Sequence, residues 1–111
     1  MALHANGFDW DKGNRIKCEK HGLSVLAIED LFTRPLAVLP DASHSQSERR
    51  YRAIGRTEQG RGVFIVFTLR PKGDEVLIRP VSARYMHKKE IQAYEEENPD
   101  LQDRPRGSGL R

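Results

Sequence analysis

The feature of this sequence that most constrains its fold is the run VFIVFTL, within the segment from Val63 to Arg70. The run is apolar at both odd and even positions, so it should form a central strand that is covered, at least in part, on both faces. Strand-like segments flank it, from Arg49 to Thr57 and from Glu75 to Ala83, and short loops with Gly60 and Gly73 join the three. This pattern predicts an antiparallel meander.

Two helices are predicted before the meander. Phe8, Asp9 and Trp10 are typical of a short strand, and Asp11 is placed to cap a helix over residues 12–21 that ends at Gly22. Ser24 is placed to cap a second helix, which Pro35 stops. A brief apolar segment and the polar loop 40–48 then lead to the first strand of the meander.

The third strand contains Pro80, which cannot donate to a strand ladder, so we predict an edge or a bulge there. A last helix is predicted over residues 87–97, and the tail 98–111 has little to bury, so we expect it to be mobile. A length of 111 residues fits one domain. We therefore predict a single α+β domain over residues 1–97.

Several classes of protein are disfavoured by what the sequence lacks. No apolar run approaches the roughly 18 residues needed to cross a bilayer, and the start MALHANGFDWDK does not resemble a signal peptide. These features predict a soluble, cytoplasmic protein without a membrane partner. A single cysteine, Cys18, excludes an intramolecular disulfide, and the four histidines show no zinc-ligand spacing. We expect neither a metal nor another cofactor.

Charge is unevenly distributed along the chain. Residues 49–89 carry 11 Lys and Arg against 3 Asp and Glu, whereas residues 90–103 carry six acids and no base. A block this rich in arginine suits a polyanion, because guanidinium groups match phosphate oxygens in pairs. The alternative for such a block is a solvated charged surface.

The end of the third strand and the start of the last helix concentrate reactive groups. Arg79, Arg84, Tyr85, His87 and Glu90 all fall here, near a helix N-terminus that favours an anion. Side chains alternate between the two faces of a regular strand, so Arg79 and Arg84, which are an odd number of residues apart, would face opposite ways. Pro80 makes this alternation unreliable here. Alternatively these groups, with Lys88 and Lys89, form surface ion pairs, Tyr85 packs as an ordinary aromatic, and His87 only caps the helix.

Two further groups of cations are candidates for binding. Lys17, Lys20 and His21 fall at i, i+3 and i+4 of the first predicted helix, on one face. Arg52 and Arg56 share one face of the first meander strand and could line a groove. Alternatively, the cations of the helix only interact favourably with the helix dipole, and the two arginines of the strand only face solvent.

Taken together, these pieces resemble the BrnT-type toxins of bacterial type II toxin–antitoxin modules, which have a RelE-like ribonuclease fold. The resemblance runs from Phe8 to about Glu96. It rests on ordered pieces: Phe8-Asp9-Trp10-Asp11; Lys20-His21-Gly22 with Ser24; Asp41, His44-Ser45 and Glu48-Arg49 before Ile54-Gly55-Arg56; Ile78-Arg79-Pro80-Val81-Ser82-Ala83-Arg84; and Lys89-Glu90 with Tyr94-Glu95. Cys18 and His87 depart from residues common in the family, as does the tail after Asn98.

The resemblance implies a translation-arresting, metal-independent endoribonuclease. It also implies a small BrnA-like antitoxin with a ribbon-helix-helix region, through which alone the complex would contact operator DNA. Cleavage of RNA by its own 2′-hydroxyl needs an acid, a base and charge stabilisation. Arg84 and Arg79 suit the last role, with Arg56 assisting, and the acid and base are left open among His21, His87, Tyr85 and Glu90. Lys17, Lys20, Arg52, Arg56, Lys88 and Lys89 are the candidates for RNA binding.

Two other functions are compatible with the same residues. A non-catalytic module that binds RNA or a protein partner would act by occupancy, with its arginines only holding phosphates. A purely structural subunit is disfavoured by the basic block. The RNA specificity, the need for a ribosome and the stoichiometry with an antitoxin are left open by the sequence.

Overall fold

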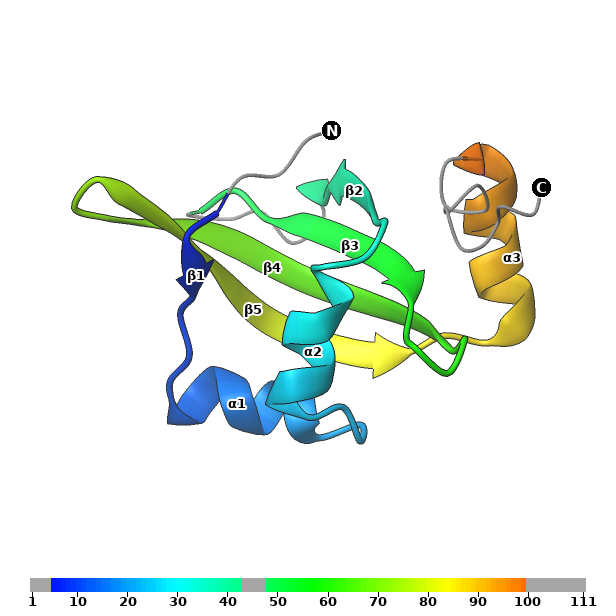
Figure 1. Cartoon of the computed structure of the whole chain (residues 1–111), viewed down its shortest axis with the longest axis horizontal. Coiled ribbons are helices and arrows are strands. Elements are labelled where there is room, and N and C mark those ends of the chain that lie inside the picture. The colour runs from blue at the N-terminus through cyan, green and yellow to red at the C-terminus, as the bar shows by residue number, and fades with distance from the viewer. Residues whose placement is uncertain (1–4, 43–47, 100–111) are drawn as a thin grey trace.

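The computed structural model describes residues 5–42 and 48–99 of the chain (Figure 1). Within these ranges the chain forms three helices and one five-stranded mixed sheet, so the predicted α+β class is confirmed. The predicted tail lies, from residue 100 on, outside the described residues. The elements in chain order are β1 (Gly7–Phe8), α1 (Lys12–Glu19), α2 (Val25–Leu31), β2 (Ala37–Pro40), β3 (Tyr51–Arg56), β4 (Gly62–Lys72), β5 (Glu75–Tyr85) and α3 (Lys88–Glu97).

The sheet is ordered β1-β5-β4-β3-β2, with β4 in the centre. The predicted antiparallel meander is confirmed as β3, β4 and β5. Two strands extend it: β1 pairs with β5 in parallel, and β2 pairs with β3 in antiparallel orientation. We predicted only a brief apolar segment where β2 lies, because four residues are too few for alternation to identify a strand. A second difference is that β5 continues to Tyr85, so Arg84 lies inside a strand and not beyond it.

The predicted caps of the first two helices are confirmed. The Asp11 side chain accepts a hydrogen bond from the Asn14 backbone N–H at 3.0 Å, and the Asn14 side chain accepts one from the Asp11 N–H at 2.7 Å. Ser24 caps α2 by accepting from the backbone N–H of Ala27. Gly22, with a φ of 93°, turns the chain between the two helices in a conformation that favours glycine.

The main core lies between α1, α2 and one face of the sheet. Ile65 and Phe67 of β4 are fully buried in it, together with Ile28 of α2 and Cys18 of α1. Burial raises the pKa of the Cys18 thiol to about 11, so this cysteine packs and is no nucleophile at neutral pH. On the other face of the sheet, α3 makes a smaller core, in which Ile91 is buried. The predicted coverage of the central strand on both faces is therefore confirmed.

A β-bulge interrupts β5 where the sequence predicted it. Ser82 pairs with Val66 and Pro80 pairs with the next residue of β4, so Val81 is the extra residue. The bulge changes which way the following side chains point. Arg79 and Arg84 pair with Thr68 and Phe64, which are four residues apart in β4 and share a face. The two arginines therefore lie on the same face of the sheet, despite their odd separation in sequence.

Asn14 joins α1 to this bulge. Its side chain is buried and donates to the backbone oxygen of Pro80 at 2.8 Å and to that of Asp9 at 3.0 Å. These bonds join the end of β1 and the bulge of β5 to the same side chain of α1. They hold α1 beside β5, with the C-terminal half of α1 next to the strand segment that carries Arg84.

We expect Asn14→Ala to lower the free energy of unfolding by about 1 to 3 kcal/mol, because buried carbonyl groups lose their donor. Urea or thermal unfolding of the purified variant measures this. Asn6→Ala is the matched control, since Asn6 makes a single exposed bond to the Val76 backbone N–H. Equal losses in the two variants would show that the buried amide does not anchor α1.

Candidate functional site

A groove runs along the sheet face that is opposite to the main core, with β4 and β5 as its floor and α1 as one wall. It consists of two adjoining hollows of about 580 and 510 Å³, which share Lys17, Arg50 and Val81. We call the whole the basic groove. Its smaller hollow, the cationic half, contains Lys20, His21, Phe64, Val66, Ser82 and Arg84; its larger hollow, the mixed-charge half, contains Asp11, Glu48, Thr68, Arg70 and Arg79.

The structure brings the cations of the first helix to Arg84. The helix predicted over 12–21 ends at Glu19, so Lys17 lies in its last turn, Lys20 is its C-cap and His21 follows in the turn; all three line the same hollow as Arg84. The predicted cationic patch is therefore one wall of a groove whose floor carries an arginine. An imidazole, two ammonium groups and a guanidinium around one hollow form a site that suits a phosphodiester.

Arg84 is held in place by two neighbours. Its two terminal nitrogens donate to the carboxylate oxygens of Glu90 at 3.1 and 2.8 Å, and its guanidinium carbon lies 4.7 Å from the centre of the Phe64 ring. The hydrogen bond from Arg84 holds the pKa of Glu90 below its ordinary value. Glu90 is therefore ionised and engaged, which favours an orienting role for it over that of a general base.

Arg79 lies in the mixed-charge half and is tied to two carboxylates. Its Nη2 donates to Asp11 at 2.8 Å, and Nη1 lies 3.5 Å from Asp9. The side chain is 19% exposed. Because Asp11 also caps α1, Arg79 links that helix to β5 in addition to facing the groove.

Tyr85 does not join Arg84. It pairs with Val63 in the register, points to the opposite face and packs against the main core. On that side the guanidinium of Arg61 stacks on the Tyr85 ring at 3.5 Å. Tyr85 therefore does not share a phosphate site with Arg84, because β5 continues through Tyr85 and adjacent strand residues face opposite ways.

Arg52 and Arg56 share a strand face as predicted, but they do not line the groove. The last helix covers that part of the sheet: Arg52 donates to the Tyr94 hydroxyl at 3.0 Å, and Arg56 forms a two-pronged pair with Glu95, with Nη2 to Oε1 at 2.8 Å. The hydrogen bond to Glu95 raises the pKa of Arg56 above its ordinary value. These arginines hold α3 on the sheet, a contact that the spacing in sequence does not reveal.

The first turn of α3 contains the remaining candidates. The His87 backbone N–H donates to Glu90 at 3.3 Å, so this histidine begins the helix beside the Arg84–Glu90 pair. Lys88 borders a separate small hollow beside Arg56, and Lys89 is exposed. Neither lysine lines the basic groove.

Three residues of the groove were missed as candidates: Arg50, Arg70 and Glu48. Arg50 lies immediately before β3, two residues from Arg52, and Arg70 lies six residues from Phe64 in β4. Residues an even number of positions apart in a strand share a face. Strand alternation could have placed both on the groove face. No signal in the sequence places Glu48, since it lies just before β3 in the polar loop.

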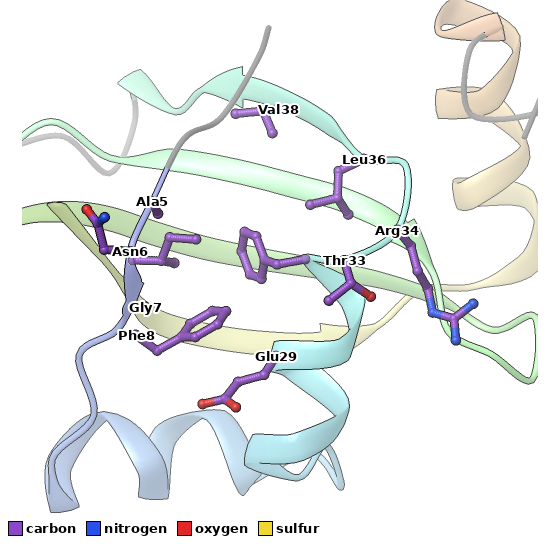
Figure 2. Close-up of a pocket in the computed structure, with 11 residues that line it drawn as sticks. Ala5, Asn6, Gly7, Phe8, Glu29, Thr33, Arg34, Leu36 and Val38 are labelled. Atoms are coloured by element: carbon purple, nitrogen blue, oxygen red, sulfur yellow. The ribbon is translucent and has the colours of Figure 1, made fainter. Parts of the chain in front are cut away.

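A third hollow, of about 460 Å³, lies on the opposite side of the sheet, against β1, the end of α2 and β2 (Figure 2). Apolar side chains of Phe8, Leu36 and Val38 line it together with polar ones such as Asn6 and Thr33. Of its charged residues, Glu29 accepts from the Trp10 indole and Arg34 pairs with Asp30. It shares no lining residue with the basic groove.

An arginine-rich groove on the open face of the sheet of an α+β domain suits a polyanion. The profile of one family, described as the ribonuclease toxin BrnT of type II toxin–antitoxin systems, matches residues 10–90. The chain belongs to this family of ribonuclease toxins, which act on RNA and are paired with a protein antitoxin. A comparison with curated proteins found no match. None of the helices in the described ranges is long and apolar enough to cross a membrane.

Proposed function

We propose that the protein is a metal-independent endoribonuclease whose reaction centre is the cationic half of the basic groove. The observation that supports this most is that His21, Lys20 and Lys17 line the same hollow as Arg84. In the proposed reaction the 2′-oxygen of the substrate attacks the adjacent phosphorus and the bond to the 5′-oxygen breaks. The products are a 2′,3′-cyclic phosphate and a 5′-hydroxyl.

Each side chain has a role in this proposal. Arg84, oriented by Glu90, stabilises the charge of the phosphorane. His21 exchanges a proton with the 2′-hydroxyl or with the leaving 5′-oxygen, and His87, next to Glu90, is the second candidate for proton transfer. Lys17 and Lys20 hold the flanking phosphates.

The proposal extends to the partners and the domain. Residues 1–97 act as one toxin domain in the cytoplasm, and a BrnA-like ribbon-helix-helix antitoxin neutralises it by covering the basic groove with an acidic or apolar segment. Operator DNA is bound only through that antitoxin.

The test of this function is incubation of the purified protein with single-stranded RNA in the presence of excess EDTA. We expect cleavage to continue, with cyclic-phosphate and 5′-hydroxyl ends identified by mass spectrometry. RNA that carries a 2′-O-methyl group throughout should bind and stay intact, since the nucleophile is blocked. Binding of unmodified RNA without any cleaved product would favour the alternative, a module that acts by occupancy.

A further inference from the structure

The two halves of the basic groove differ in chemistry. Among the residues that line the cationic half there is no carboxylate, whereas Asp11 and Glu48 line the mixed-charge half beside Arg70 and Arg79. Lys12 and Arg50 also line the mixed-charge half, but a carboxylate repels a phosphate, so Asp11 and Glu48 make this half less suited to the RNA backbone than the cationic half. Carboxylates accept hydrogen bonds from the N–H groups of nucleobases, and guanidinium groups donate to base oxygens and ring nitrogens. The lining of this half is therefore suited to a base.

Glu48 and Arg70 form a side-by-side pair within this half. Nε and Nη2 of Arg70 donate to the two Glu48 oxygens at 2.7 and 3.3 Å. This contact holds the pKa of Glu48 below its ordinary value, so the carboxylate is ionised at neutral pH. Each carboxylate oxygen has a second lone pair, and a guanidinium has five N–H groups of which Glu48 engages two. The pair thus places acceptors directly next to donors, on two side chains that orient each other.

Guanine is the base that complements such a pair. It presents two neighbouring donors, N1–H and the N2 amino group, beside the acceptor O6. Adenine and cytosine present one amino group beside an acceptor, and uracil presents one N–H between two acceptors. A carboxylate next to an arginine therefore makes more hydrogen bonds to guanine than to any other base.

We propose that the mixed-charge half of the basic groove is a guanine-binding subsite, in which Glu48 accepts from N1–H and the N2 amino group and Arg70 donates to O6. The inference rests on the proposed function, because the base belongs to an RNA whose scissile phosphate occupies the cationic half. The two halves adjoin through Lys17 and Arg50, so the recognised base is next to the cleavage point.

The test uses short 2′-O-methyl oligonucleotides, which the proposed reaction does not cleave. One position of a uridine oligomer is varied among the four bases and inosine, and affinity is measured by fluorescence anisotropy at fixed salt. We expect the guanosine oligomer to bind about tenfold more tightly than the others. Inosine lacks the N2 amino group, so it should lose most of this preference while the protein is unchanged.

The corresponding protein variant is Glu48→Gln, which replaces one acceptor by a donor at nearly the same shape. Its preference for guanosine should fall to about twofold or less, while its affinity for the all-uridine oligomer does not fall, because the change removes a negative charge from the groove. Glu58→Gln is the matched control, since Glu58 lies in the turn between β3 and β4 with a side chain that is 76% exposed. This control should keep the preference.

Equal affinity of the unaltered protein for guanosine, inosine and uridine oligomers would overturn the inference, as would a preference that Glu48→Gln keeps in full. These outcomes are independent of the test for catalysis. RNA cleavage without a guanine preference would contradict the subsite alone. A guanine preference without cleavage would contradict the proposed reaction alone.

Discussion

Arg84→Ala is expected to lower the rate of RNA cleavage by about 10² to 10³, because the cationic half loses the guanidinium that stabilises the transition-state charge. Growth arrest on induced expression should disappear with it. The fold should survive, since the Arg84 and Glu90 side chains are 43% and 32% exposed and such a pair contributes little to stability. Cleavage of a fluorescent RNA and a thermal melt of the same preparation measure the two effects.

Arg15→Ala is the matched control for this variant. Arg15 is exposed on α1 and borders a small hollow of that helix, away from the basic groove. It should retain full cleavage and toxicity. An Arg84→Ala variant that remained as toxic as the parent, or that lost toxicity only by unfolding, would move the reaction centre away from the cationic half.

His21→Ala is expected to reduce cleavage by about 10² to 10⁴, the usual contribution of a positioned proton-transfer group. His21 lines the hollow that holds Arg84, whereas His87 begins α3 and reaches this hollow only through Glu90. His87→Ala should therefore have the smaller effect.

The readout that separates catalysis from folding is the affinity for 2′-O-methyl RNA. The His21 variant should bind this RNA within a few-fold of the parent. A large loss of cleavage in the His87 variant and none in the His21 variant would assign the proton transfer to the start of α3 instead.

Local rules account for much of the fold that could be predicted. Asp11 and Ser24 cap their helices as expected, because capping depends on a few neighbouring residues. The meander follows from alternation and glycine loops. The position of the bulge follows from Pro80, but the alignment of Arg79 with Arg84 depends on which residue is extra, and that depends on pairing with β4.

The candidate site was harder to predict than the fold. The grouping of Lys17, Lys20 and His21 followed from helical spacing, and their meeting with Arg84 depends on the packing of α1 against β5. Arg52 and Arg56 were placed in the wrong surroundings, since their binding by Tyr94 and Glu95 depends on where α3 docks. The periodicity of a sequence predicts on which face of a strand or helix a side chain lies, but it does not predict which other element packs against that face.

The docking of α1 beside β5 also determines when during synthesis the protein can become harmful to its host. The wall of the basic groove is translated early, up to His21, whereas Arg84 on the floor of the groove is translated much later. At the usual 5 to 20 residues per second these parts are made roughly 3 to 13 s apart. The groove forms only after β5 has left the ribosome and paired with β1, which was made long before it. Under the proposed function, a nascent chain therefore lacks its reaction centre for most of its translation, and an antitoxin already present in the cell can bind the groove as it forms.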